Sequence, residues 1–177
     1  MRVYITDLSA YNQGFLIGEW IELGIDEDEL NQSIKRILKM GGEACKDGSI
    51  HEEYFLTDWE GEEFFQVGEN TNVYELNEEV ARFNELEDDS SKKCVSFLMS
   101  EKIVSDLDDA IEKSAEVVIY ENCDFSELSQ QIADEIYCLD DYPEFVSNYF
   151  DYDALARDLE LEGFYHEMDG DIFYYPY

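Results

Sequence analysis

The 177-residue chain carries 45 Asp and Glu residues against 11 Lys and Arg residues, which gives a net charge of -34. A charge of this sign repels nucleic acid, anionic lipid headgroups and most acidic ligands, so a basic partner is favoured. The 45% hydrophobic and 15% aromatic content is nevertheless too high for an intrinsically disordered chain. The chain is therefore expected to fold, as one domain or as a few small modules.

Residues 1–62 are expected to form a small α/β module. Residues 2–8 alternate as a strand does, the turn formers at 9–14 interrupt the pattern, and the apolar run at 15–23 predicts a second strand. Residues 51–57 predict a further strand.

Between these strands lies the clearest helix signal in the sequence. Asp26 followed by Glu29 matches a capping box, and basic residues farther along complement the negative end of the helix dipole. Gly41 and Gly42 are expected to end this helix. Its apolar face comprises Leu30, Ile34, Ile37 and Leu38.

Residues 63–114 predict a helical module of three short helices. Apolar residues recur at helical spacing around Val80 and around Leu98, and Ser105 is expected to cap the third helix. The polar stretch 85–91 predicts a loop.

Residues 115–177 again predict an α/β module. The β-branched run at 116–120 indicates a strand, and Asp124 begins a helix with a capping-box pattern. Asp169-Gly170 is a two-residue hairpin signal. The three modules together predict an α+β fold with short mixed or antiparallel sheets.

The stretch from Leu139 to Gly163 combines acids, offset only by Arg157, with large apolar side chains. Pro143 suits the first turn of a helix, and Asp151 is a candidate cap for the next. The apolar residues expected to face the core or a dimer partner are Tyr149, Phe150, Leu155 and Leu159. The acids expected to form a partner-binding surface are Asp140, Asp141, Glu144, Asp151, Asp153, Asp158, Glu160 and Glu162.

Catalytic and metal-binding sites have little support in the sequence. With 45 acids many carboxylate pairs must lie close by chance, and nothing singles one out as an acid and base. His51 and His166 fall in predicted strands with no third ligand at a recognisable spacing, so ordinary strand roles are favoured. No enzymatic activity, cofactor or metal is expected.

The cysteines and the apolar runs also bear on location. The four cysteines lie far apart with no CxxC pair, which favours reduced and mostly buried side chains. No secretory signal precedes the first strand, and no apolar run approaches the roughly 20 residues of a membrane helix. A cytoplasmic protein that binds neither membrane nor nucleic acid is expected.

The size of the charge suggests one use for it. Duplex DNA carries one negative charge per about 1.7 Å of axis, so the net charge equals the phosphates of roughly 17 base pairs. A folded acidic surface could therefore compete for a DNA-binding cleft. Composition alone supports this role and a merely solvated surface, of the kind found in halophilic proteins, about equally.

Several motifs resemble the ArdA antirestriction family. YFDY at 149–152 is followed by ARDLE at 156–160 and then by Gly163, and the opening RVYITDLSAYNQGFLIGEWIEL and the internal YFLTDWEG resemble two further landmarks. The family-matched positions are Leu139, Asp140, Pro143, Glu144, Tyr149, Phe150, Asp151, Tyr152, Arg157, Asp158 and Glu160. Asp141, Asp153 and Glu162 join them on charge alone.

The resemblance implies a non-enzymatic DNA mimic that occupies the DNA-binding groove of type I restriction-modification enzymes in a bacterial host. It also implies an elongated homodimer with three small modules in each chain. The alternative is an acidic adaptor or structural protein that binds a different basic protein.

Overall fold

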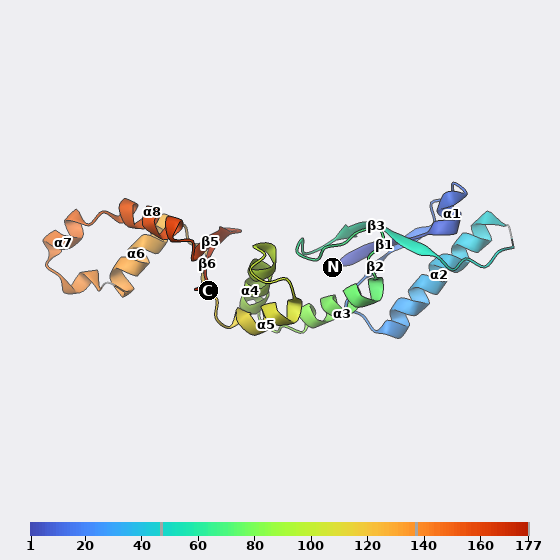
Figure 1. The fold of residues 1–177 in the computed structure, drawn as a ribbon, viewed down its shortest axis with the longest axis horizontal. Coiled ribbons are helices and arrows are strands. Elements are labelled where there is room, and N and C mark those ends of the chain that lie inside the picture. The colour runs from blue at the N-terminus through green and yellow to red at the C-terminus, as the bar shows by residue number, and fades with distance from the viewer. Residues whose placement is uncertain (47, 137, 177) are drawn as a thin grey trace. The chain divides into compact units, whose positions relative to one another are not determined.

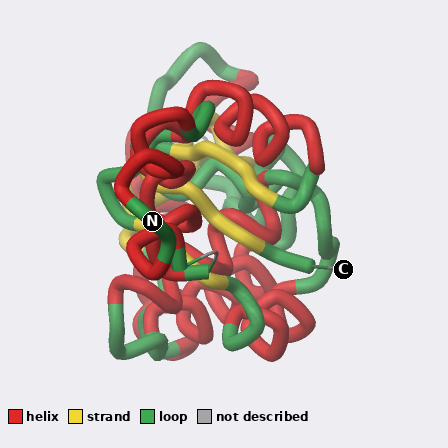
Figure 2. The backbone as a smooth tube through the Cα atoms, turned by 90° about the vertical axis from the view of Figure 1, so that its left-hand side faces the viewer, coloured by secondary structure: helices red, strands yellow, loops and turns green. Residues whose placement is uncertain are grey.

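The computed structural model describes residues 1–46, 48–136 and 138–176, and the side chain of Asp140 lies outside this description. The described residues form an α+β fold with eight α-helices and two three-stranded antiparallel sheets (Figure 1). The predicted fold class is thus confirmed. The chain divides into two compact units, unit 1 (Met1–Asp89) and unit 2 (Ser90–Tyr177), and helices outweigh strands in each. Figure 2 shows the helices in red and the strands in yellow. The division into three modules at 62/63 and 114/115 remains a prediction.

Unit 1 is built on sheet 1, whose strand order is β2-β1-β3. In β1, Val3 lies opposite Ile21 of β2 and Trp59 of β3, and the register with β3 shifts after Tyr4. The elements in chain order are β1 (Arg2–Asp7), α1 (Leu8–Asn12), β2 (Gly18–Glu22), α2 (Glu27–Cys45), β3 (Tyr54–Glu60) and α3 (Val73–Asn84).

One face of sheet 1 packs against α2. Alternate residues of a strand point to opposite faces, so the fully buried Val3 and Ile5 lie on the side of the helix. The helix presents Leu30, Ile34 and Ile37 there, all buried as the apolar periodicity predicted. Leu38 is only half-buried.

The predicted interruption between the first two strands is confirmed, but residues 8–12 form the single-turn helix α1 and only Gln13 and Gly14 form a turn. Asp7 caps α1 by accepting a hydrogen bond from the Ala10 amide at 2.8 Å. The other carboxylate oxygen of Asp7 lies 2.6 Å from Nδ1 of His51, and both side chains are fully buried. His51 precedes β3, so its predicted strand position is wrong.

The predicted end of α2 at Gly41 and Gly42 is wrong, since the helix continues to Cys45 and closes with Lys46 in the left-handed region at φ 54°. Gly41 is needed inside the helix, because a Cβ there would overlap the Asp7 carboxylate. At the other end, Asp26 caps α2 as predicted, through the Asp28 amide at 2.9 Å.

Unit 2 is built on sheet 2, whose strand order is β4-β6-β5. Its elements are α4 (Asp89–Ser100, whose first residue closes unit 1), α5 (Leu107–Ser114), β4 (Val118–Tyr120), α6 (Phe125–Glu135), the 3-10 turn η1 (Leu139–Asp141), α7 (Glu144–Tyr149), α8 (Tyr152–Glu162), β5 (Tyr165–Met168) and β6 (Asp171–Tyr174).

Both faces of sheet 2 are covered. Ile172 of β6 packs with Leu128 and Ile132 of α6 and with Leu159 of α8 in one cluster. The next residue, Phe173, points to the opposite face and stacks on Phe97 of α4 with ring centroids 4.8 Å apart.

Most of the predicted turns and caps in unit 2 are confirmed. Asp124 and Glu127 form the capping box of α6. Asp169 and Gly170 both have positive φ, 54° and 83°, as the tight turn between β5 and β6 requires. The cap of α5 is Asp106, one residue beyond the predicted Ser105.

The cysteines are less buried than predicted. None of the four, all within the described residues, is in a disulfide. Cys94 and Cys123 are buried, Cys45 is half-buried and Cys138 is exposed. Burial raises the pKa of the Cys123 thiol. In the ranges that the structure describes, no helix is long and apolar enough to cross a membrane.

Candidate partner-binding surface

The predicted acidic stretch consists of η1, α7 and α8, joined by short connections. Every predicted site residue whose side chain is described is exposed: Asp141, Glu144, Asp151, Asp153, Asp158, Glu160 and Glu162. Asp140, the eighth, has a described backbone in η1, but its side chain lies outside the description.

Helix α8 is oriented by its apolar side. Leu159 is buried in the cluster with α6 and β6, and Leu155 packs against that cluster, as expected for these two residues. Asp151 caps the helix by accepting a hydrogen bond from the Ala154 amide at 2.9 Å. Gly163 closes the helix with φ 78°. With Leu155 and Leu159 turned inward, Asp153 and Glu160 are turned outward. Glu162 is exposed at the end of the helix.

The aromatic residues before α8 are less buried than a core role requires. Tyr149 is 88% exposed, Phe145 65% and Tyr142 56%. Tyr149 was expected to face either the core or a dimer partner. Its exposure excludes the core of its own chain and leaves the dimer partner as a prediction. Phe150 is half-buried and packs edge-on against Tyr152, with centroids 4.9 Å apart.

The charges of this stretch are not neutralised from within. None of the seven described acids is seen in an ion pair in the part of the chain that the structure covers. Arg157, the only Lys or Arg after Lys113, is itself exposed. Carboxylates arranged in this way remain open to an external cation.

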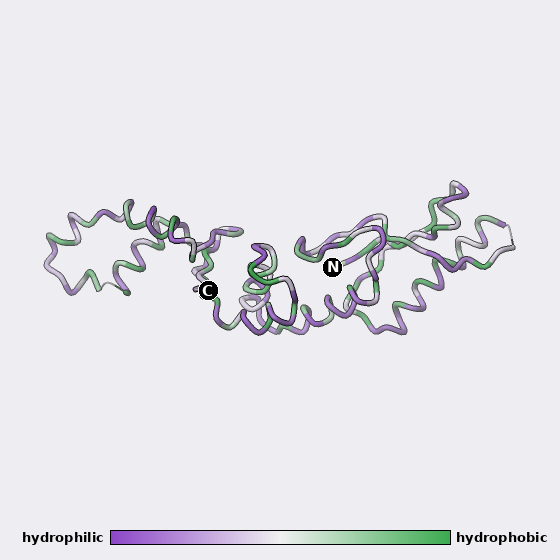
Figure 3. The backbone as a smooth tube through the Cα atoms, viewed as in Figure 1, coloured by the Kyte–Doolittle hydropathy of each residue, from purple (hydrophilic) through white to green (hydrophobic). Residues whose placement is uncertain are grey.

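The acidity extends well beyond the predicted stretch. Unit 1 has 23 acidic and 6 basic residues and unit 2 has 22 and 5, so each has a net charge of -17. Hydrophilic residues recur along both units (Figure 3). The prediction omitted Asp134 and Glu135, which are exposed on α6, the helix packed against α8. The signal available for Asp134 was its position off the Leu128 and Ile132 face. Glu135 falls on that face by helical spacing and is exposed at the last residue of α6.

Two of the described acids are buried and act within the fold. Among the described residues only Asp7 and Asp171 are buried acids. Lys93 donates a hydrogen bond of 2.5 Å to Asp171, and the Asn122 amide donates one of 2.8 Å. Both bonds lower the pKa of Asp171, and the bond from Lys93 has the larger effect. The same bond raises the pKa of Lys93.

Nothing in the described geometry gathers ligands for a metal. No group of three or more His, Cys, Asp or Glu side chains there is placed to hold an ion. His166 lies in β5 as predicted, with its Nδ1 3.7 Å from a carboxylate oxygen of Glu101. The described acidic surface therefore presents separate carboxylates and not a metal-binding cluster.

Comparison with protein families identifies the chain. The model of the family described as "Antirestriction protein (ArdA)" matches residues 3–174. The chain belongs to the ArdA antirestriction family. The match includes all eight predicted site residues and nearly all of both units. No curated protein gives a significant match.

Membership in this family supports an antirestriction function and an interaction with restriction enzymes. ArdA is a family of antirestriction proteins and not a known enzyme family. The resemblance of the YFDY and ARDLE motifs to this family is thereby confirmed.

Proposed function

We propose that this ArdA protein is a DNA mimic that occupies the DNA-binding groove of a type I restriction-modification enzyme. Occupying the groove blocks restriction, and it blocks modification to the extent that methylation uses the same groove. The supporting observation is the set of exposed carboxylates on α7 and α8 that have no internal ion pair.

The amount and spread of charge favour mimicry of a duplex. At one charge per about 1.7 Å of duplex axis, a net charge of -17 corresponds to the phosphates of about 8 to 9 base pairs in each unit. Phosphate contacts position a DNA-binding protein without reading sequence. A folded acidic surface can engage the same basic groups without presenting any base.

We further propose that the protein acts as a homodimer, which doubles the mimicked length to about 34 base pairs. The exposed rings of Tyr142, Phe145 and Tyr149 support a protein contact at and just before α7, because aromatic side chains are enriched at protein interfaces. We take a second copy of the chain as the occupant, because dimerisation extends the mimicked length.

Competition with DNA tests the mechanism. A purified type I methyltransferase core, labelled duplex and increasing amounts of the protein should show displacement of the duplex, and added DNA should relieve the inhibition. Displacement should weaken as salt rises, since the Debye length is about 8 Å at physiological ionic strength. A complex that forms without displacing DNA would instead identify an acidic adaptor.

A block of neutral substitutions tests the surface itself. Asp140→Asn, Asp141→Asn and Glu144→Gln together should weaken competition while circular dichroism and thermal melting stay unchanged. Full inhibition by this variant would remove η1 and the start of α7 from the interface.

An equal-charge block on unit 1 is the matched control. Glu78→Gln, Glu85→Gln and Glu87→Gln together change the net charge by the same amount at three exposed positions. If this control variant loses less inhibition than the first variant, the acids of η1 and α7 have a special role. Equal losses assign the effect to total charge.

A further inference from the structure

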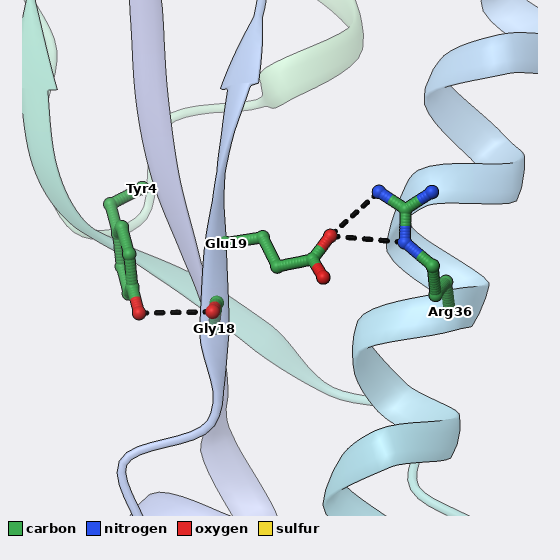
Figure 4. Close-up of polar contacts among 4 residues, drawn as sticks. All are labelled: Tyr4, Gly18, Glu19 and Arg36. Carbon is green, nitrogen blue, oxygen red and sulfur yellow. Dashed lines mark hydrogen bonds and ion pairs between the residues drawn. The ribbon is translucent and has the colours of Figure 1, made fainter.

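The outer face of sheet 1 carries a row of aromatic side chains on the side opposite α2. The Tyr4 hydroxyl donates a hydrogen bond of 2.9 Å to the Gly18 carbonyl, so its ring lies across β2. Gly18 permits this approach, because a Cβ there would overlap the Tyr4 ring. Glu19 instead reaches the Arg36 guanidinium on α2, and Figure 4 shows Tyr4 and Arg36 on opposite sides of β2.

A cavity of about 410 Å³ lies on this outer face. Three aromatic rings line it, from Tyr4, Tyr11 and Phe55. The rings of Tyr11 and Phe55 meet edge to face with centroids 5.2 Å apart. Leu16, 79% exposed, also lines the cavity.

The polar groups of the cavity are of two kinds. Thr6 and Thr57 also line it, and their hydroxyl oxygens lie 2.8 Å apart, so these two groups satisfy each other. Glu69 is exposed, and no ion pair to its carboxylate is seen within the described residues. The main chain of Glu69 is fixed, since its carbonyl accepts a hydrogen bond of 3.1 Å from the Leu56 amide of β3. The cavity therefore combines aromatic walls with one available negative charge.

The same sheet already shows how such a combination binds a cation. The Arg2 guanidinium lies 4.7 Å above the centre of the Trp20 ring and donates to the Glu60 carboxylate at 2.6 and 2.8 Å. Trp20 in turn contacts Tyr4 edge to face at 5.5 Å. The rings of Trp20 and Tyr4 thus connect the site occupied by the Arg2 guanidinium to the cavity.

We infer that this cavity binds the guanidinium group of an arginine side chain presented by a basic protein partner. The aromatic faces attract the cation through their quadrupoles, and Glu69 supplies the carboxylate. Arginine fits better than lysine, because its planar and weakly hydrated group stacks on rings while it donates to a carboxylate. The net charge of -17 on unit 1 draws such a partner in.

This inference deepens the proposed function, on which its choice of partner rests. A DNA-binding groove holds phosphates with Lys and Arg side chains. The cavity would give unit 1 one discrete anchoring pocket within a surface that otherwise acts through dispersed charge. Arginine anchors in pockets are common energetic hot spots of protein interfaces.

A direct ligand test needs no restriction enzyme. N-acetyl-arginine amide is titrated into the intact protein and the ring signals of Tyr11 and Phe55 are followed by NMR. N-acetyl-citrulline amide, which has nearly the same shape and no charge, is the control ligand. We expect saturable shifts with the arginine compound alone. Equal shifts with both compounds, or shifts spread over acids throughout the chain, would overturn the inference.

Variants sharpen this test. Tyr11 is 48% exposed, so Tyr11→Leu should remove the ring without preventing folding. Tyr11→Phe keeps the ring. Tyr11→Leu and Glu69→Gln should each weaken arginine binding by roughly 3- to 30-fold. Tyr11→Phe and the charge-matched Glu78→Gln on α3 should bind as the parent does. Unchanged binding by Tyr11→Leu would overturn the inference.

The two proposals fail separately. If the cavity binds arginine amide but the protein does not displace DNA, the cavity stands and the proposed target is wrong. If the protein displaces DNA but arginine amide does not shift Tyr11 and Phe55, the proposed function stands and the cavity assignment is wrong.

Discussion

The two units carry the same net charge and each contains one three-stranded antiparallel sheet, yet they use their apolar side chains differently. Sheet 2 is covered on both faces, with Ile172 packed toward α6 and α8 and Phe173 stacked on Phe97 of α4. Sheet 1 is covered by α2 on one face and keeps Tyr4 and Phe55 half-exposed around a cavity on the other. Equal acidity therefore does not imply equal use of the sheets: sheet 2 places Phe173 in the core of unit 2, whereas sheet 1 keeps Tyr4 and Phe55 at a cavity. The exposed rings of unit 2 lie before α8 and not on its sheet.

The largest expected effect tests this contrast in coverage. Phe173→Ala should lower the free energy of unfolding by about 3 to 5 kcal/mol, the usual cost of truncating a buried aromatic side chain. Phe55→Ala should cost much less, because Phe55 is only half-buried. Chemical denaturation with hydrogen exchange read separately for each unit measures both. Equal costs would show that the outer face of sheet 1 is as closely packed as sheet 2.

The next effect concerns the close packing of α2 in unit 1. Gly41→Ala should destabilise unit 1 by about 1 to 3 kcal/mol, because the new methyl group overlaps the Asp7 carboxylate next to His51. Gly42→Ala is the control, since its Cβ would meet the Ser49 carbonyl oxygen at 3.4 Å and Cδ2 of His51 at 3.9 Å without overlap. The control should stabilise the helix by up to about 1 kcal/mol. Opposite shifts in melting temperature are expected, and shifts of the same sign would contradict the role given to Gly41.

A smaller effect should separate the buried acid of unit 2 from the exposed acids. The pKa of Asp171 is lowered in the native state, so its contribution to stability is present above the ordinary aspartate pKa of about 3.9 and is lost as the pH falls toward the native value. Asp171→Asn should therefore melt a few degrees below the parent at neutral pH, with the difference closing below about pH 4. Melting curves across this range measure it. A constant difference would mean that the ionised Asp171 does not stabilise unit 2.

The smallest effect is expected for a single exposed acid. Glu162→Gln should change competition with DNA by no more than the 0 to 1 kcal/mol typical of an exposed ion pair. Its melting temperature should equal that of the parent, because Glu162 is exposed at the end of α8. Affinity measured by displacement of labelled duplex decides this. A tenfold loss would indicate a discrete contact at Glu162 in unit 2, as proposed for Glu69 in unit 1.

Local chemistry made much of the fold predictable. The caps at Asp26, Asp124 and Asp151 and the Asp169-Gly170 turn were recognisable, because each is set by a side chain or backbone conformation within a few residues. Errors arose where distant residues decide the structure. Position 41 is a glycine inside α2 because the Asp7 carboxylate and the His51 ring occupy the space where a Cβ would lie. No residue near Gly41 in the sequence indicates this contact.

The candidate surface was predictable in part for a similar reason. The exposure of acids such as Glu160 follows from the inward spacing of Leu155 and Leu159. The exposure of Tyr149 does not follow from the sequence, because an aromatic residue beside leucines is equally compatible with a core. The cavity beside Glu69 was also beyond reach, since it joins β1, α1 and β3 with residues far apart in sequence.

The uneven burial of the cysteines has a practical consequence. Cys138 is the one exposed thiol among the four, and it directly precedes η1, the start of the acidic stretch. Cys94 and Cys123 are shielded by burial, and Cys45 is partly shielded. A thiol-reactive dye should therefore modify Cys138 first in the native protein. The unmutated chain thus contains its own attachment point for a fluorescent reporter beside the residues proposed to meet the enzyme.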